Sequence, residues 1–98
     1  MNLSMDLNDL LDKYEKRRQY SEEWMYKQDK GIILNDEFLS PYDSSTKVVL
    51  EELQRLYDEY EKKFKQIPPI GMFSVARQKA LLKQALKTHM AVNMEKLL

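Results

Sequence analysis

The sequence predicts an all-α protein that folds as a compact three-helix bundle. Only two glycines and three prolines occur in 98 residues, and leucine, glutamate and lysine are abundant, a composition that favours helices over strands. Three segments repeat apolar residues at helical spacing. Each has one apolar stripe, and packing the three stripes together is the simplest way to bury them. We therefore expect one helical domain over residues 1–98.

The first helix is expected over residues 4–29. Ser4 can serve as its N-cap, because its hydroxyl can accept a bond from a free backbone N–H group. Arg18 and Ser21 interrupt the apolar stripe of this segment. Since serine also favours helix starts, Ser21 could instead begin a second, shorter helix, with a kink near Tyr20.

The connection that follows is the least regular part of the sequence. Residues 30–45 are expected to contain a short accessory helical turn, bounded by serine, proline and aspartate. The apolar run within it, over 31–34, could be either strand or coil. No second segment offers itself as a partner strand, and an unpaired strand has marginal stability.

The second helix is expected over residues 45–66. Its apolar and aromatic residues fall within one arc, and acidic residues precede basic ones at i,i+4 on the other face. Because this apolar stripe is the widest, we place the second helix at the centre of the bundle. Pro68 disfavours helix in the residue before it, so the helix must stop there.

The third helix is expected over residues 74–88, with Ser74 as its N-cap. After it the helical period is lost. Asn93 can cap a separate terminal turn over residues 93–98, although the end of the chain could also be frayed.

Charge is distributed unevenly in a chain whose formal net charge is zero. Residues 1–66 carry a net charge of −4, and residues 67–98 carry +4. Lys79, Lys83 and Lys87 form an i,i+4 stripe on the third helix. Either the two parts attract each other within the fold, or the basic face meets an anionic partner.

Several function classes lack the residues they need. Without cysteine there is no disulfide, no cysteine-based zinc site and no thiol catalysis. The single histidine has no nucleophile motif near it, and no glycine-rich phosphate loop occurs. We therefore expect no enzyme activity, no cofactor and no metal. No apolar run is long enough to span a membrane, and the acidic N-terminal region is unlike a secretory signal, so we expect a cytoplasmic protein.

Seven residues are candidates for binding a partner, because arginine, tyrosine and tryptophan anchor interfaces and lysines supply charge. They form two surfaces, the first with Arg17, Arg18, Tyr20 and Trp24, and the second with Lys79, Lys83 and Lys87. The two arginines have an alternative interpretation. Their stems could pack within the fold while their charged groups reach solvent or a carboxylate.

The sequence thus predicts a small cytoplasmic protein–protein interaction module, a non-catalytic regulator, inhibitor or adaptor whose partner has an acidic surface. The main alternative is a small nucleic-acid-binding regulator that uses the basic helix 74–88. A third interpretation is a homo-oligomer, in which four methionines supply an adaptable interface. These are Met25, Met72, Met90 and Met94.

Overall fold

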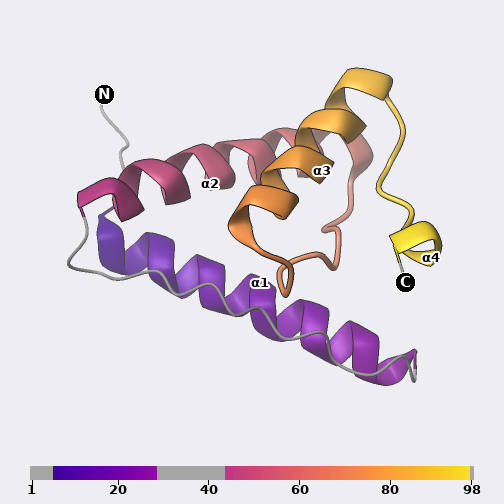
Figure 1. Cartoon of the computed structure of the whole chain (residues 1–98), viewed down its shortest axis with the longest axis horizontal. Helices are drawn as coiled ribbons and strands as arrows, with labels where there is room; N and C mark the ends of the chain where they lie inside the picture. The colour runs from indigo at the N-terminus through magenta and orange to yellow at the C-terminus, as the bar shows by residue number, and fades with distance from the viewer. Residues whose placement is uncertain (1–5, 29–43, 98) are drawn as a thin grey trace.

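The computed structural model describes residues 6–28 and 44–97, and within these ranges it contains four helices and no strand (Figure 1). The helices are α1 (Leu7–Lys27), α2 (Ser44–Phe64), α3 (Val75–Thr88) and α4 (Met94–Leu97). The predicted all-α bundle of three helices is confirmed. The accessory turn and the alternative strand over 31–34, both predicted between the first two helices, lie outside the described residues.

Helix α1 begins later than predicted and has a different N-cap. The carboxylate of Asp6 accepts a hydrogen bond of 3.0 Å from the backbone N–H of Asp9. Asp6 therefore replaces Ser4 as the cap, and its negative charge also suits the positive end of the helix dipole. No second helix starts at Ser21, because this residue is buried inside α1 and its hydroxyl donates to the carbonyl of Arg18 at 2.8 Å.

Helix α2 ends two residues before the predicted boundary. Lys65 adopts a left-handed conformation with φ of 58°, and its N–H donates to the carbonyl of Glu61 at 2.9 Å. This is the geometry of a helix C-terminus closed by a left-handed residue. The helix has already ended when the chain reaches Pro68.

The caps of the last two helices agree with the prediction. The hydroxyl of Ser74 accepts a bond of 3.2 Å from the N–H of Arg77 at the start of α3. The side-chain oxygen of Asn93 accepts one of 3.0 Å from the N–H of Glu95 in α4. The predicted terminal turn is therefore a short helix.

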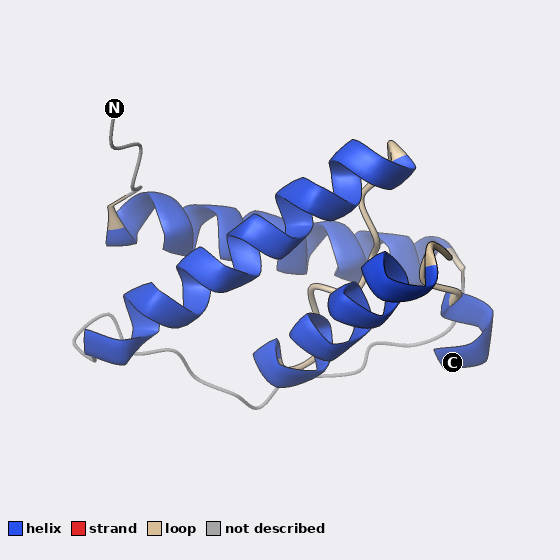
Figure 2. Ribbon diagram, turned by 90° about the horizontal axis from the view of Figure 1, so that it is seen from above, coloured by secondary structure: helices blue, strands red, loops and turns tan. Residues whose placement is uncertain are grey.

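The core lies around α2, which packs against both α1 and α3 (Figure 2). Its central position confirms the prediction. The fully buried side chains of α2 are Leu50, Leu53, Tyr57 and Tyr60. Three of the four methionines suggested for an oligomer interface are also in the core, and only Met90 is widely exposed, at 69%. The four methionines therefore do not form one surface.

The connection between α2 and α3 is held against both neighbouring helices. A Cβ atom added to Gly71 would lie 2.8 Å from the amide nitrogen of Arg18, and closer still to the carbonyl of Arg17. Glycine is thus required here because the loop backbone touches the backbone of α1. This contact fixes the position of the two prolines that precede it.

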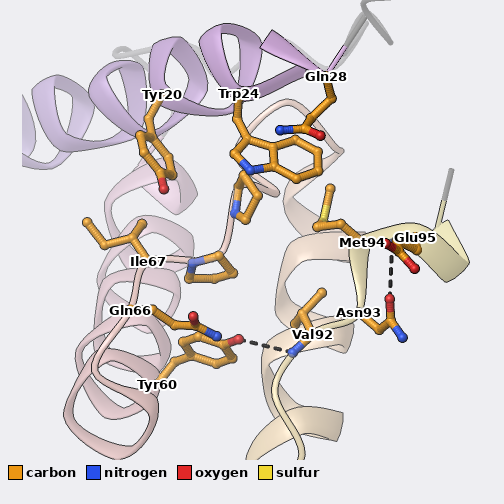
Figure 3. A pocket seen from close by; sticks show the side chains of 12 residues that line it. Tyr20, Trp24, Gln28, Tyr60, Gln66, Ile67, Val92, Asn93, Met94 and Glu95 are labelled. Carbon is orange, nitrogen blue, oxygen red and sulfur yellow. Dashed lines mark hydrogen bonds between the residues drawn. The ribbon is translucent and has the colours of Figure 1, made fainter. Parts of the chain in front are cut away.

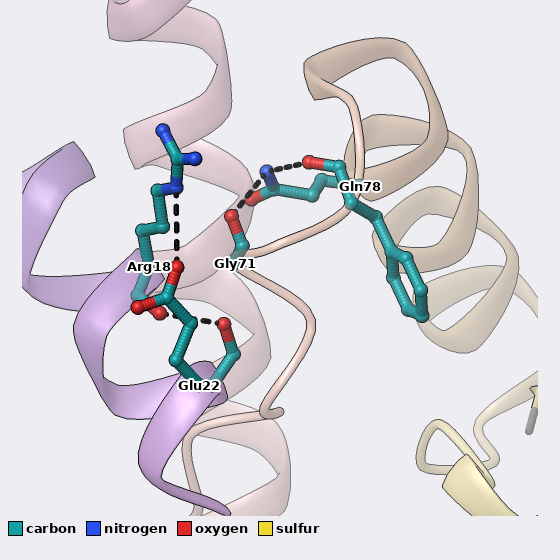
Figure 4. Close-up of polar contacts among 6 residues, drawn as sticks. Arg18, Glu22, Gly71 and Gln78 are labelled. Carbon is teal, nitrogen blue, oxygen red and sulfur yellow. Dashed lines mark hydrogen bonds and ion pairs between the residues drawn. The ribbon is translucent and has the colours of Figure 1, made fainter. Parts of the chain in front are cut away.

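Gln78, at the start of α3, secures the same connection from inside the protein (Figure 4). Its fully buried amide group donates to the carbonyls of Gly71 at 3.2 Å and Phe73 at 2.7 Å. Its oxygen accepts from the hydroxyl of Tyr57 at 2.6 Å. Because burial disfavours the phenolate, the pKa of Tyr57 is raised, and the phenol remains a donor to Gln78.

Candidate functional site

A groove of about 830 Å³ lies between α1, the connection after α2, and the C-terminal segment (Figure 3). Its lining residues come from these three parts of the chain and from α2. They are Tyr20, Trp24, Gln28, Tyr60, Gln66, Ile67, Pro68, Pro69, Val92, Asn93, Met94 and Glu95. A concave site of this size falls in the range of ligand-binding pockets.

One wall comes from the C-terminal half of α1. Tyr20, Trp24 and Gln28 follow one another at i,i+4, so their side chains form a row along one face of the helix. Tyr20 is 41% exposed, and Trp24 is half-buried. Two of the predicted partner-binding residues are therefore brought together in the groove.

The opposite wall is the connection that contains Ile67, Pro68 and Pro69. Ile67 is 42% exposed, whereas Pro68 is buried. The proline rings fix the backbone φ angle, and Gly71 and Gln78 hold the end of this segment. The wall is consequently rigid before any ligand arrives.

The buried Tyr60 joins the third segment to the bundle. Its hydroxyl accepts a hydrogen bond of 3.0 Å from the backbone N–H of Val92 (Figure 3). Met94, which is 7% exposed, packs against the core beside it. These two contacts place Asn93 and Glu95 at a third side of the groove, away from Ile67 (Figure 3).

The groove offers apolar surface and free hydrogen-bonding groups. Among the described residues, the side chains of Tyr20, Trp24, Gln28 and Gln66 form no hydrogen bond with one another or with other parts of the protein. Glu95 is the one charged residue of the lining. The lining thus combines aromatic and proline rings with hydroxyl, indole and amide groups and a single carboxylate.

Arg17, another predicted anchor, is directed into the protein instead of the groove. Its guanidinium stacks on the ring of Tyr57, 4.2 Å from the centroid, and donates to the side-chain oxygen of Gln54 at 2.6 Å. Gln54 in turn donates to Asp58 at 2.8 Å. Burial lowers the pKa of Arg17, although the neighbouring Tyr57 and Asp58 counteract this effect. The guanidinium of Arg17 is thus held within the fold, but by an aromatic ring and an amide oxygen and not by solvent or a carboxylate.

Arg18 is also engaged within the chain. Its guanidinium lies 3.5 Å from the carboxylate of Glu22, one turn along α1 (Figure 4). Both side chains remain partly exposed, at 29% and 36%. A partly exposed pair of this kind has a small net energy, so a strong anionic partner could displace Glu22.

The basic face of α3 is partly neutralised by α2. Lys79 and Lys83 lie 3.1 and 3.2 Å from the two carboxylate oxygens of Glu52. Hydrogen bonds from the two lysines lower the pKa of Glu52 below its ordinary value. Lys87 is exposed and has no ion pair among the described residues. The predicted internal attraction between the acidic and basic parts of the chain thus occurs at Glu52.

Most of the groove could not be predicted from the sequence. The i,i+4 spacing of Tyr20, Trp24 and Gln28 does predict that these three side chains lie on one face of the first helix. In the sequence, Pro68 marks the end of the second helix and Asn93 the start of a terminal turn, but neither indicates that the segments 66–69 and 92–95 lie beside the first helix. They join the site only because the connection folds back on α1 and Tyr60 binds the C-terminal segment.

No protein family, curated protein or solved structure matches this chain. Within residues 6–28 and 44–97, no helix is long and apolar enough to cross a membrane. The same residues contain no group of three or more acidic, histidine or cysteine side chains that could hold a metal ion.

Proposed function

We propose that the protein is a non-catalytic protein-recognition module, a regulator, inhibitor or adaptor, that binds its partner in the groove beside Trp24. The observation that carries the proposal is the convergence of Tyr20 and Trp24 on a concave surface with a rigid proline wall. Tyrosine and tryptophan in such settings supply a large share of binding energy. We also propose that the protein is cytoplasmic, because a chain without cysteine suits a reducing compartment.

The groove is favoured over the two other predicted contacts because its side chains are available. Arg17 is engaged with Tyr57 and Gln54, and Lys79 and Lys83 share Glu52. A partner that used these groups would first have to break existing contacts. Tyr20 and Trp24 make no hydrogen bond with the described residues, although Trp24 packs partly against the core.

The ion pairs to Glu52 also weigh against the nucleic-acid alternative. Binding to duplex DNA depends on a surface of unpaired positive charge that displaces counterions from phosphates. Lys79 and Lys83 share the single negative charge of Glu52, so the α3 stripe is partly neutralised within the protein. With Glu52 counted, the three lysines keep a net charge of +2, and the exposed Arg77 adds one more, so the ion pairs reduce the electrostatic footprint of α3 without removing it.

A pull-down from the native cell lysate, with and without nuclease, tests the proposal. The bait proteins are the unaltered chain, Tyr20→Ala and the matched control Tyr26→Ala. Tyr26 lies on the same helix and is 79% exposed, but it does not line the groove. We expect Tyr20→Ala to lose a stoichiometric protein partner that Tyr26→Ala retains, whether or not nuclease is present.

Two other results would contradict the proposal. Equal recovery of the partner by all three baits would exclude the groove as the contact surface. Loss of every partner upon nuclease treatment would favour nucleic-acid binding instead, and log affinity for random duplex DNA should then fall steeply with log salt concentration.

A further inference from the structure

We propose that the groove takes an extended, proline-rich segment of its partner that carries one basic side chain. This inference rests on the proposed function and specifies the chemistry of the ligand. It follows from three features of the lining: flat aromatic surface, free hydrogen-bond donors and a single carboxylate.

The aromatic surface suits proline rings. Tyr20 and Trp24 are one helical turn apart on α1, and Tyr20 points toward Ile67 (Figure 3), which lines the groove together with Pro68 and Pro69. A polyproline II helix has three residues per turn and presents flat ring surfaces that pack on aromatic side chains. Since the ligand is already extended before it binds, little conformational entropy is lost.

The free donors suit a backbone whose carbonyls are unpaired. Trp24 offers an indole N–H, Tyr20 a hydroxyl, and Gln28 and Gln66 offer amide groups, and all four side chains line the groove without a hydrogen-bond partner in the described part of the chain. A polyproline II segment has no internal hydrogen bonds, so its carbonyls need donors. The backbone carbonyls of a bound α-helix already accept hydrogen bonds within the helix, so these donors would have no backbone acceptor.

The carboxylate suits a basic residue in the ligand. Glu95 is exposed, has no ion pair among the described residues, and is the one charged group of the lining. The lining therefore carries a formal charge of −1. An arginine or lysine in the ligand could pair with Glu95, and it could also stack on the nearby aromatic rings.

Trp24 provides the reporter for a direct test, because it is the only tryptophan in the chain. The probe is a synthetic peptide with two short runs of proline joined by one arginine, added to the whole protein while tryptophan emission is recorded. Controls are the same peptide with glutamate in place of arginine and an amphipathic helical peptide. The protein variants are Tyr20→Ala, Glu95→Gln and Tyr26→Ala.

We expect a saturable change in emission with the proline–arginine peptide. Tyr20→Ala should weaken binding by at least about tenfold, as expected for an aromatic anchor. Glu95→Gln, or glutamate in the peptide, should weaken binding by roughly fivefold, as expected for an exposed ion pair. Tyr26→Ala should bind like the unaltered protein.

Other outcomes would overturn the inference and are distinguishable from failure of the proposed function. No response to the proline–arginine peptide, while Tyr20→Ala still loses the lysate partner, would reject the proline-rich ligand but retain the groove as a protein site. A response only to the helical peptide would mean that the groove binds an α-helix. Emission that changes when the protein alone is diluted would assign it to a second copy of the chain. If neither the peptide nor the lysate partner depends on Tyr20, both proposals fail.

Discussion

Replacing Gln78 by alanine should strongly destabilise the protein, because this one side chain joins α2, α3 and the connection that forms a wall of the groove. Its amide makes three hydrogen bonds, to Tyr57, Gly71 and Phe73, and is fully buried. Each such bond contributes about 1 kcal/mol, and a buried group left without a partner costs about 1–3 kcal/mol. Gln78→Ala should therefore lower the free energy of unfolding by about 3–5 kcal/mol, a large part of the roughly 5–15 kcal/mol typical of a small domain.

Urea unfolding followed by far-ultraviolet circular dichroism measures this loss, because the midpoint and slope together give the free energy of unfolding. Gln84→Ala is the matched control, since Gln84 lies on the same helix but is exposed, and it should change stability by less than about 0.5 kcal/mol. Gln78→Met keeps most of the volume and should still lose about 2 kcal/mol or more. If Gln78→Ala and Gln84→Ala unfold at the same urea concentration, the network does not hold the connection.

Three further changes test other contacts. Gly71→Ala should cost about 3 kcal/mol in urea unfolding, because its Cβ would meet the unyielding backbone at Arg17; a loss below about 1 kcal/mol would contradict the close contact. The pKa of Glu52 is lowered in the folded state, so its ion pairs stabilise the protein fully at pH values above its ordinary pKa of 4.5. This stabilisation is lost as the pH falls through the lowered pKa. In thermal unfolding, Glu52→Gln should be less stable near neutral pH, and its deficit should vanish well below pH 4.5; a deficit independent of pH would exclude the charge as its cause. Tyr60→Phe should cost about 1 kcal/mol and speed hydrogen exchange at the Val92 amide; unchanged exchange would mean that the hydroxyl does not hold the C-terminal segment.

The helices could be predicted where their signals are local. Ser74 and Asn93 act as the predicted caps because a side-chain oxygen needs only a backbone N–H two or three residues away. The end of α2 was harder to predict. The left-handed conformation of Lys65 ends the helix before Pro68 does, and no glycine or asparagine announces it.

The site could be predicted only in part, because its walls come from distant segments. Tyr20 and Trp24 could be named from the sequence as candidate anchors, because they are aromatic residues on the first helix. Their counterparts at 66–69 and 92–95 depend on how the connection meets α1, which no helical period encodes. The arginines illustrate the same limit: the apolar stripe drew attention to Arg18, but the position of Tyr57 on α2 makes Arg17 the more enclosed of the two.

The central claim is that the groove beside Trp24 is the binding surface, and nuclear magnetic resonance tests it most directly. The single indole N–H gives one isolated cross-peak in a ¹⁵N-labelled sample, and it can be followed as the partner recovered from the lysate is added. The account predicts that this peak moves together with the backbone amides of residues 92–95, while the amides of residues 79–87 stay in place. Shifts confined to residues 79–87, with the indole peak unmoved, would contradict it and assign binding to the basic face of α3.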